Sequence, residues 1–349
     1  MGGAFLSLSK REKTFFAVFA LVVAVFLFVT PYILLPKIYA GRDEWVKTAP
    51  PNAVFLELWE IDTFEGGSAS RARFLEKNAY LYQERTIGTY VLVRTLDLNQ
   101  AKLMLEQGSR PDIVSYGVGA GELLEAITTE ITSDCGVRAD LLAGGVKNGK
   151  QLAIPWCMGG YVLCADGDFG ELNVDNFTKA QETSELSVIG TGQNYNIPVL
   201  SLNEDEKKYL KISNLTQYQA YESYLKGNDF SVLLGTQRDF YRLNNKVNMG
   251  VMAPLNYKYL NTYTDLIQYF SITSSNENQI NHAQDFIKFV TSQLVQNKLN
   301  SIGMFTVNGS TIYSNEYADF ERALNSKLKV LNVFTPNVKI EEIQNKGEL

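Results

Sequence analysis

The sequence predicts an α/β protein with a largely parallel sheet, preceded by one transmembrane helix. Strand-like and helix-like segments alternate between residues 53 and 116, as in parallel strands joined by helices. Residues 15–35 contain no charged side chain. A helix of that length, at about 1.5 Å per residue, spans the roughly 30 Å hydrocarbon core of a bilayer. The chain has 349 residues, so we expect about two domains.

The N-terminal end is predicted to anchor the protein in the cell membrane as a single-pass chain. Lys10, Arg11 and Lys13 precede the apolar run, so the positive-inside rule places the N-terminus in the cytoplasm and the body on the extracellular side. A secretory signal has a shorter apolar region of about 7–15 residues, and cleavage after Ala40 is the alternative. The cytoplasmic tail, the transmembrane helix and a proline-containing linker are assigned to residues 1–14, 15–35 and 36–52.

The first part of the body gives a regular alternation of elements. Phe74, Leu75, Ala79 and Tyr82 recur at helical spacing, and Gly108 ends a second helical segment. The pattern predicts three strands, at residues 53–59, 89–93 and 111–116, and two intervening helices, at residues 70–85 and 98–107. Ligands bind parallel sheets at the carboxyl ends of the strands, so residues 59–68 and 116–121 are candidate site segments.

The rest of the body is patterned less regularly. Gly159 and Gly160 separate two strand-like pieces, and Phe286, Ile287 and Val290 lie on one face of a late amphipathic helix. Further strands are predicted at residues 152–156, 161–165 and 230–235, and further helices at residues 218–225 and 283–299. A second α/β unit is consistent with this order of elements.

Composition excludes several classes of function. A single histidine, His282, rules out zinc sites built on several imidazoles and leaves a Ser-His-Asp triad only one possible base. Residues 53–349 hold 26 basic and 35 acidic groups, a net charge of −9, which speaks against nucleic-acid binding. Three cysteines imply no disulfide framework, although a Cys157–Cys164 pair stays open beside the preferred interpretation of buried free thiols. We expect no metal, no cofactor and no catalytic residue.

Several runs, in this order along residues 53–310, resemble one family. They are LELWEIDTFEGGSASRARFLEKNA, PDIVSYG, AIPWCMGGYVL, YLKGNDFSVLLGTQRDFYRL, YTDLIQYFSIT and HAQDFIKFVTSQLVQNKLNSIGMFTVNG. The chain resembles the extracellular solute-binding proteins of ABC importers, in the sugar-binding group that includes maltose-binding protein. The resemblance implies a two-lobe, type II periplasmic-binding-protein-like fold with crossing hinge strands. Lobe 1 would hold residues 53–157 and 266–303, and lobe 2 residues 158–265 and 304–349.

The same resemblance implies a function without covalent chemistry. The protein would capture a small solute, a sugar or oligosaccharide, between its lobes and deliver it to an ABC permease in the membrane. Closure would follow from contacts that the ligand makes to both lobes at once.

A sugar site needs aromatic platforms, carboxylates or amides, and arginine. Trp59 and Trp156 end strand-like pieces and are expected to stack on the ligand, with core packing as the alternative. Glu60 and Asp62 would accept hydroxyl protons, or lie in a solvated loop. Arg238 would bind the ligand or form a surface salt bridge. The remaining candidates are residues of loops and strand ends, namely Gly67, Ser68, Tyr116, Gly160, Tyr161 and Tyr241.

Two other functions stay open. Asp166-Gly167-Asp168 is a D-x-D motif, which in a type II membrane glycosyltransferase would hold a divalent cation, although Asp-Gly-Asp is also ordinary turn chemistry. Alternatively, the same binding fold would present its ligand to a membrane kinase as a sensor. The sequence does not separate a sensor from a transport component because both share the ligand-binding step.

Overall fold

The computed structural model describes residues 52–64, 66–132, 134–165, 188–190, 197–209, 211–213, 215–226 and 232–349, together with residues 11, 14–16, 18, 19 and 23. Val54–Leu349 form one compact unit, the body of the protein. Most of the predicted membrane segment and all of the D-x-D motif lie outside the described residues. Within the described residues, no helix is long and apolar enough to cross a bilayer. The transmembrane helix therefore stays a prediction.

A five-stranded sheet forms the first part of the body. Its strand order is β2-β1-β3-β13-β6. Strands β1, β2 and β3 are parallel, as predicted, whereas β13 runs antiparallel to both of its neighbours. The five strands are β1 (Val54–Ile61), β2 (Thr89–Leu96), β3 (Ile113–Tyr116), β6 (Ile154–Met158) and β13 (Ile267–Ile272).

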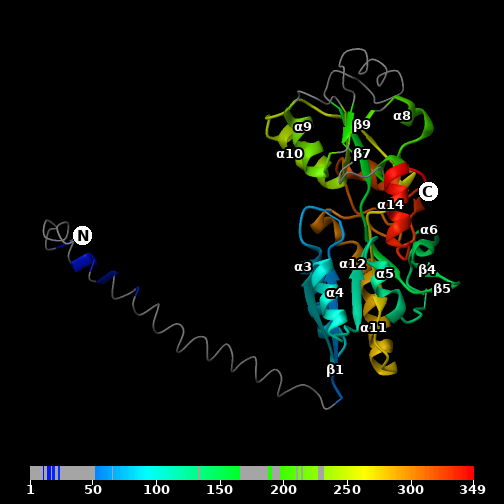
Figure 1. Ribbon diagram of the computed structural model, residues 1–349. Helices are drawn as coiled ribbons and strands as arrows, with labels where there is room; N and C mark the ends of the chain where they lie inside the picture. Colours follow the sequence, from blue (N-terminus) through cyan, green and yellow to red (C-terminus); the bar gives the residue numbers. More distant parts are fainter. Residues whose placement is uncertain are drawn as a thin grey trace. The chain divides into compact units, whose positions relative to one another are not determined.

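A smaller antiparallel sheet, of order β10-β7-β11, forms the second part. Figure 1 shows it at the opposite end of the body from the start of β1. Its strands are β7 (Tyr161–Ala165), β10 (Val232–Thr236) and β11 (Asn256–Tyr259). The two-stranded pairings join β4 (Val146–Lys147) to β5 (Lys150–Gln151), β8 (Val188–Gly190) to β9 (Lys211–Ser213), and β12 (Tyr263–Thr264) to β14 (Lys329–Val330).

The chain crosses between the two sheets at segments that are hydrogen-bonded to one another. Gly159 and Gly160 join β6 to β7, and the Gly159 amide donates to the carbonyl of Leu266 on the returning segment. Met158 and Phe305 exchange two backbone hydrogen bonds, so a third segment lies beside them. These hydrogen bonds pair the backbone amides and carbonyls that are buried where the chain crosses between the sheets. The boundaries predicted for the two lobes, residues 53–157 with 266–303 and 158–265 with 304–349, stay a prediction.

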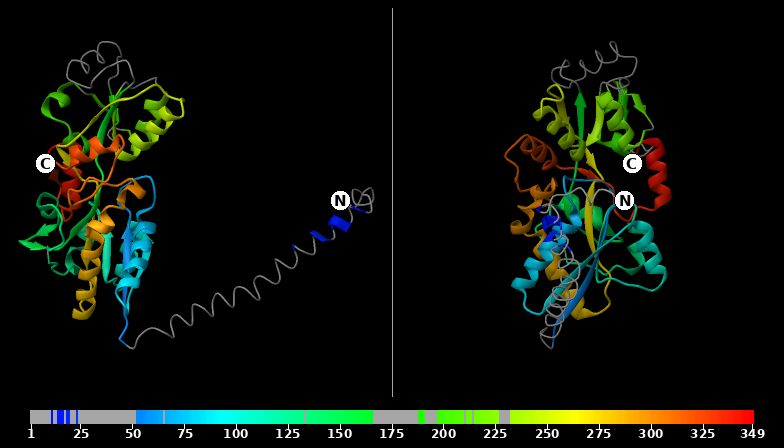
Figure 2. Two further views of the ribbon diagram at one scale, coloured as in Figure 1. Left: turned by 180° about the vertical axis from the view of Figure 1, so that it is seen from behind. Right: turned by 90° about the vertical axis from the view of Figure 1, so that its left-hand side faces the viewer.

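Helices cover both faces of the larger sheet. Ser70 caps the first long helix by accepting a hydrogen bond from the Arg73 amide, and this helix packs with the late helix over one face. The views in Figure 2 show the two side by side. The α-helices of the body are α3 (Arg71–Arg85), α4 (Leu98–Glu106), α5 (Gly121–Leu124), α6 (Ala139–Leu142), α8 (Glu204–Tyr209), α9 (Gln217–Lys226), α10 (Gln237–Asn248), α11 (Glu277–Thr291), α12 (Gln293–Gln296), α13 (Tyr317–Leu324) and α14 (Asn337–Lys346).

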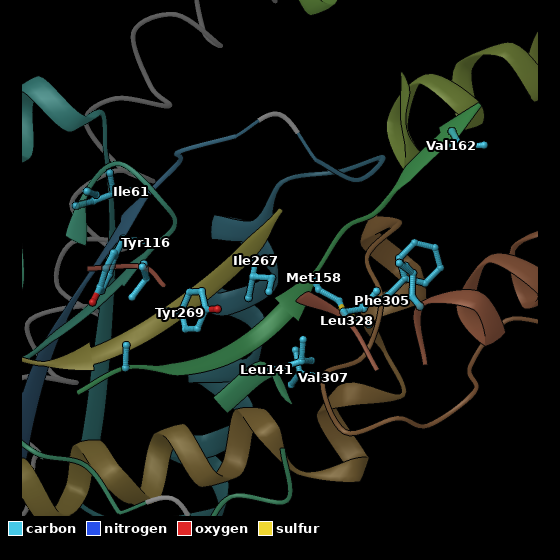
Figure 3. Packing of buried hydrophobic residues seen from close by; sticks show 14 of the residues in the cluster. Ile61, Tyr116, Leu141, Met158, Val162, Ile267, Tyr269, Phe305, Val307 and Leu328 are labelled. Carbon is cyan, nitrogen blue, oxygen red and sulfur yellow. The ribbon is translucent and has the colours of Figure 1, made fainter. Parts of the chain in front are cut away.

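A buried apolar cluster runs from the other face of the larger sheet to the smaller one. Tyr269 and Ile267 of β13 belong to it, and Ile267 is paired with Met158 of β6. Figure 3 shows Phe305 beyond Met158, and Val162 farther along the chain in the second sheet. The two sheets therefore share one continuous core across the crossing segments.

The late helix differs from its prediction. Residues 283–299 are not one helix, because Ser292 adopts an extended conformation with ψ of 151° and separates α11 from α12. Helix α11 also begins earlier, after its cap Asn276, so His282 lies inside it. The His282 Nδ1 atom lies 2.9 Å from the Thr89 hydroxyl. All three cysteines are buried free thiols.

Candidate functional site

A hollow of about 550 Å³ opens where β1 ends and α3 begins. We call it the Arg71 hollow. Its lining comes from the loop after β1, from the first turn of α3 and from Arg238, which α10 contributes beside the second sheet. The residues that define it are Asp62, Thr63, Phe64, Gly66, Ser68, Ala69, Ser70, Arg71 and Arg238.

Arg71 organises this loop. Its Nη2 donates to Asp62 Oδ1 at 2.7 Å and to the carbonyl oxygen of Phe64 at 2.7 Å. The guanidinium carbon lies 4.2 Å from the centre of the Phe64 ring, within cation–π range. The Arg71 side chain is only 3% exposed, whereas that of Asp62 is 58% exposed. The loop is therefore folded around a buried cation whose carboxylate partner faces solvent.

Glu60 lies beneath the hollow as a fully buried carboxyl group. Desolvation raises its pKa to about 8, against the lowering effects of Arg71, whose Nε lies 3.7 Å away, and of Ser115 and Gln268. Gln268 Nε2 donates to the carbonyl oxygen of Ile61 at 2.8 Å and to Glu60 Oε1 at 3.3 Å. Because a carbonyl oxygen only accepts, these contacts fix the orientation of the amide and leave Gln268 Oε1 as an acceptor.

Four buried polar atoms around the hollow have no hydrogen-bond partner among the described residues. They are Glu60 Oε2, Thr63 Oγ1, Arg71 Nη1 and Gln268 Oε1. A Cβ built on Gly117 would lie 2.2 Å from Thr63 Oγ1 and 3.4 Å from Gln268 Oε1, so this glycine lets the β3 end approach both atoms. Unpaired buried polar atoms are costly. The set offers donors and acceptors together, as a polyhydroxylated or acidic solute requires.

Some predicted site residues meet here. Asp62, Ser68 and Arg238 line the Arg71 hollow, and Glu60 lies below it. Gly67 forms the turn at φ 73°, where a Cβ would lie 2.0 Å from the carbonyl oxygen of Ile302. These residues come from a strand end, a loop and a distant helix.

The predicted aromatic platforms do not line the hollow, and the structure argues against their stacking on a ligand. Trp156 is fully buried between Phe74 and Phe270, with ring centroids 6.0 and 5.5 Å away in stacked geometry. Its indole donates to the Ser115 hydroxyl. Trp59 is equally buried and donates to Glu57 Oε1. Both belong to the core because the sheet faces on which they lie are covered.

Tyr116 is also a core residue rather than a cleft residue. Its side chain is fully buried, its hydroxyl lies 2.7 Å from the Ser271 hydroxyl, and its ring meets Phe334 edge to face. Burial raises the pKa of this phenol well above its usual range. The prediction that it faces the cleft is not supported, because β3 is central in the sheet and both of its faces are covered.

The remaining candidates lie away from the hollow lining. Gly160 is in the crossing, where its amide donates to Gln237 Oε1 and its carbonyl accepts from the Gln237 amide. Tyr161 is buried, and its hydroxyl donates to Asp265 Oδ1 at 2.6 Å. Tyr241 is 40% exposed on α10, one turn after Arg238. Gly160 and Tyr161 therefore stabilise the join between the sheets.

Sequence reasoning missed Thr63, Phe64, Arg71 and Gln268. Arg71 had a usable signal, because it is the first residue of α3, where the helix dipole disfavours a cation. Gln268 had none, since its side chain reaches Glu60 only through the pairing of β13 into the sheet. Within the described ranges there is no group of three or more His, Cys, Asp and Glu side chains that could hold a metal ion.

No family model matches the chain, and no curated protein sequence matches it. Solved structures match its fold. The GacH receptor of Streptomyces glaucescens, studied with acarbose, is 11% identical, covers 83% of this chain and 91% of its own, and has a TM-score of 0.58. A Rhizobium etli sugar transporter in an open conformation is 14% identical, with coverages of 83% and 92% and a TM-score of 0.57.

Iron-bound HitA from Pseudomonas aeruginosa also matches, at 14% identity, with coverages of 85% and 100% and a TM-score of 0.54. Likeness at such identities shows the fold alone. The body has the α/β fold of type II periplasmic binding proteins, and the predicted resemblance to the maltose-binding-protein-like group is confirmed at that level.

Proposed function

We propose that this protein is the extracellular solute-binding component of an ABC importer and that it captures a carbohydrate without covalent chemistry. One observation carries the proposal. The Arg71 hollow lies at the carboxyl end of β1 and is lined from both sides of the crossing, by the β1–α3 loop and by Arg238 of α10. Ligands of α/β folds bind at such strand ends.

The chemistry of the hollow supports a polar solute. Ser68, Ser70 and Thr63 present hydroxyl groups, and Asp62 with the two arginines presents charged acceptors and donors. Sugar hydroxyls pair with such groups, and Phe64 offers an apolar surface for C–H faces. Proteins of this fold include several named for maltose or maltodextrin binding, which makes a saccharide the first ligand class to test.

Membrane anchoring and delivery to a permease complete the proposal. The uncharged run at residues 15–35 would keep the body at the outer surface, close to a membrane partner. The absence of covalent chemistry implies that the permease's ATPase supplies the energy for transport. The D-x-D alternative lies outside the described residues and gains no support from the hollow.

The test is a thermal-shift panel on the purified whole chain. We expect a mono- or oligosaccharide to raise the melting temperature, because a ligand at 100 times its Kd stabilises the folded state by about 2.7 kcal/mol. Ferric iron belongs in the panel as a separate arm, since HitA of this fold is iron-bound.

Ala69→Trp is the matched variant, because it places a large ring in the hollow lining. It should abolish the shift, whereas Lys102→Trp on the exposed face of α4 should keep it. A panel in which no saccharide changes the melting temperature would refute the carbohydrate assignment. An equal rise in melting temperature in both variants would show that the ligand binds outside the Arg71 hollow.

A further inference from the structure

Two arginines from distant parts of the chain line the Arg71 hollow, each in the first turn of its helix. Arg71 is the first residue of α3 and Arg238 the second residue of α10. The first turn of a helix carries unpaired amides and a partial positive charge, so cations are disfavoured there and anions are favoured. Helix α3 has no acidic residue in its first turn to offset this charge, whereas α10 has Asp239 there.

Arginines outnumber carboxylates among the described residues that line the hollow. Arg71 and Arg238 each carry a positive charge, and Asp62 is the one carboxylate of the described lining. The body as a whole is acidic, with a net charge of −9 over residues 53–349. Two cationic side chains in one concave site on an acidic protein favour an anionic ligand there.

A buried donor points to the same ligand chemistry. Arg71 Nη1 has no hydrogen-bond partner among the described residues, although the side chain is 3% exposed and lines the hollow. Its other nitrogens are held by Asp62 and by the Phe64 carbonyl, so only Nη1 is left for another acceptor. Glu60 Oε2 and Thr63 Oγ1 are further unpaired atoms that donate when protonated.

We propose that the solute carries a carboxylate, as a sugar acid does, and that this group binds between Arg71 and Arg238 at the first turns of α3 and α10. The proposal rests on the proposed function and names the ligand class for the same site. A guanidinium N–H forms a charge-assisted hydrogen bond to a carboxylate that a neutral hydroxyl does not match, and Nη1 of Arg71 is left for such a bond. The Phe64 ring stacked on Arg71 has to shift for the carboxylate to reach Nη1.

The experiment compares sugars that differ only in the acidic group. Glucuronate and galacturonate are titrated against the whole chain beside glucose and galactose, with sodium acetate and sodium sulfate as free anions. We expect a uronate to bind at least tenfold more tightly than its neutral parent. Its affinity should fall several-fold between low and high sodium chloride, and that of the neutral sugar should not.

Variants connect the effect to the hollow. Arg238→Gln should weaken uronate binding by a factor at least tenfold larger than the factor by which it weakens binding of the neutral parent sugar. Arg73→Gln, an exposed arginine two residues after Arg71 on α3, is the matched control and should change neither. Arg71→Lys keeps a charge but loses the Nη1 donor, so it should also weaken uronate binding.

The outcomes separate this inference from the proposed function. Equal affinities for uronates and neutral sugars would overturn the carboxylate site while leaving carbohydrate capture intact. A shift by acetate or sulfate as large as that by uronates would overturn it as well, since a free anion would then suffice. If no sugar of either kind binds, carbohydrate capture and the sugar-acid inference fail together.

Discussion

At the scale of single residues, substitution of Trp156 tests whether its indole packs in the core or stacks on a ligand. Its ring is stacked on both sides, and its Nε1 donates to Ser115. We expect Trp156→Phe to lower the free energy of unfolding by about 1–3 kcal/mol, through a small cavity and an unpaired hydroxyl. Ligand affinity should stay unchanged. The measurement is urea unfolding beside ligand titration, with exposed Phe55→Leu as the neutral control.

If Trp156→Phe abolished binding while leaving stability unchanged, the core assignment would be wrong. The ligand-stacking hypothesis would then return.

Glu60 gives a pH-dependent prediction whose sign follows from its raised pKa. Between about pH 4.5, the ordinary value of the carboxyl group, and about pH 8, the folded protein binds this proton more tightly than the unfolded chain does. The stabilisation is present at low pH and is lost as pH rises through that window, by up to about 1.4 kcal/mol per pH unit. Glu60→Gln, which mimics the neutral acid, removes this loss.

Unfolding of both proteins in urea from pH 5 to pH 8 checks the Glu60 prediction. The variant should gain stability relative to the wild type as the pH rises. Parallel curves for the two proteins would show that Glu60 ionises with an ordinary pKa.

Local sequence signals account for part of the candidate site. Asp62 and Ser68 follow a predicted parallel strand, and such strand ends meet at one edge of a sheet. Trp59 and Trp156 lie in the core, which is the alternative that the sequence left open. The sequence does not decide between the two because a strand end is also where helices begin to cover a sheet, and no local pattern shows which helix does so. Gln268 depends on long-range pairing, which no local pattern encodes.

At the scale of elements, α4 offers a direct test of helix capping. Asp97 accepts from the Gln100 amide, and the Gln100 side chain accepts from the Asp97 amide. Because Asp97→Ala leaves one amide of the first turn unpaired, we expect it to lower the free energy of unfolding by about 1 kcal/mol. Lys102→Ala on the same helix is the control, with a change within about 0.5 kcal/mol. Equal effects in chemical unfolding would contradict the capping argument.

Elements were predictable where their patterns are local. Strands β1 and β2 and helices α3 and α4 begin within one residue of their predicted starts, because periodicity and caps define them. The late helix was predicted as continuous because Ser292 is flanked by good apolar spacing, and nothing like proline marks its extended backbone. The position of β13 between β3 and β6 follows from tertiary pairing across about 110 to 160 residues.

At the scale of the whole molecule, this chain and the solved structures have the same fold although few of their residues are identical. What they have in common is the pattern of buried positions. The match to the GacH receptor extends over 83% of this chain at 11% identity. Cores tolerate extensive hydrophobic exchange when volume and pattern are kept, so such a fold persists while its site residues change. A site in this fold must therefore be argued from its own residues, here from Arg71, Arg238 and their surroundings.

The membrane anchor is the last prediction, and it concerns the part of the chain that precedes the body. Replacing Leu21 and Val22 by Lys would place two charges near the centre of the uncharged run, at about 2.5–3.5 kcal/mol each. We expect the wild-type chain to stay in the membrane fraction after an alkaline wash and this variant to leave it. Thr48→Lys with Asn52→Lys, both in the linker just before the body, should remain in the membrane. A wild-type chain recovered with Gly41 as its first residue would show that the segment is a cleaved signal instead.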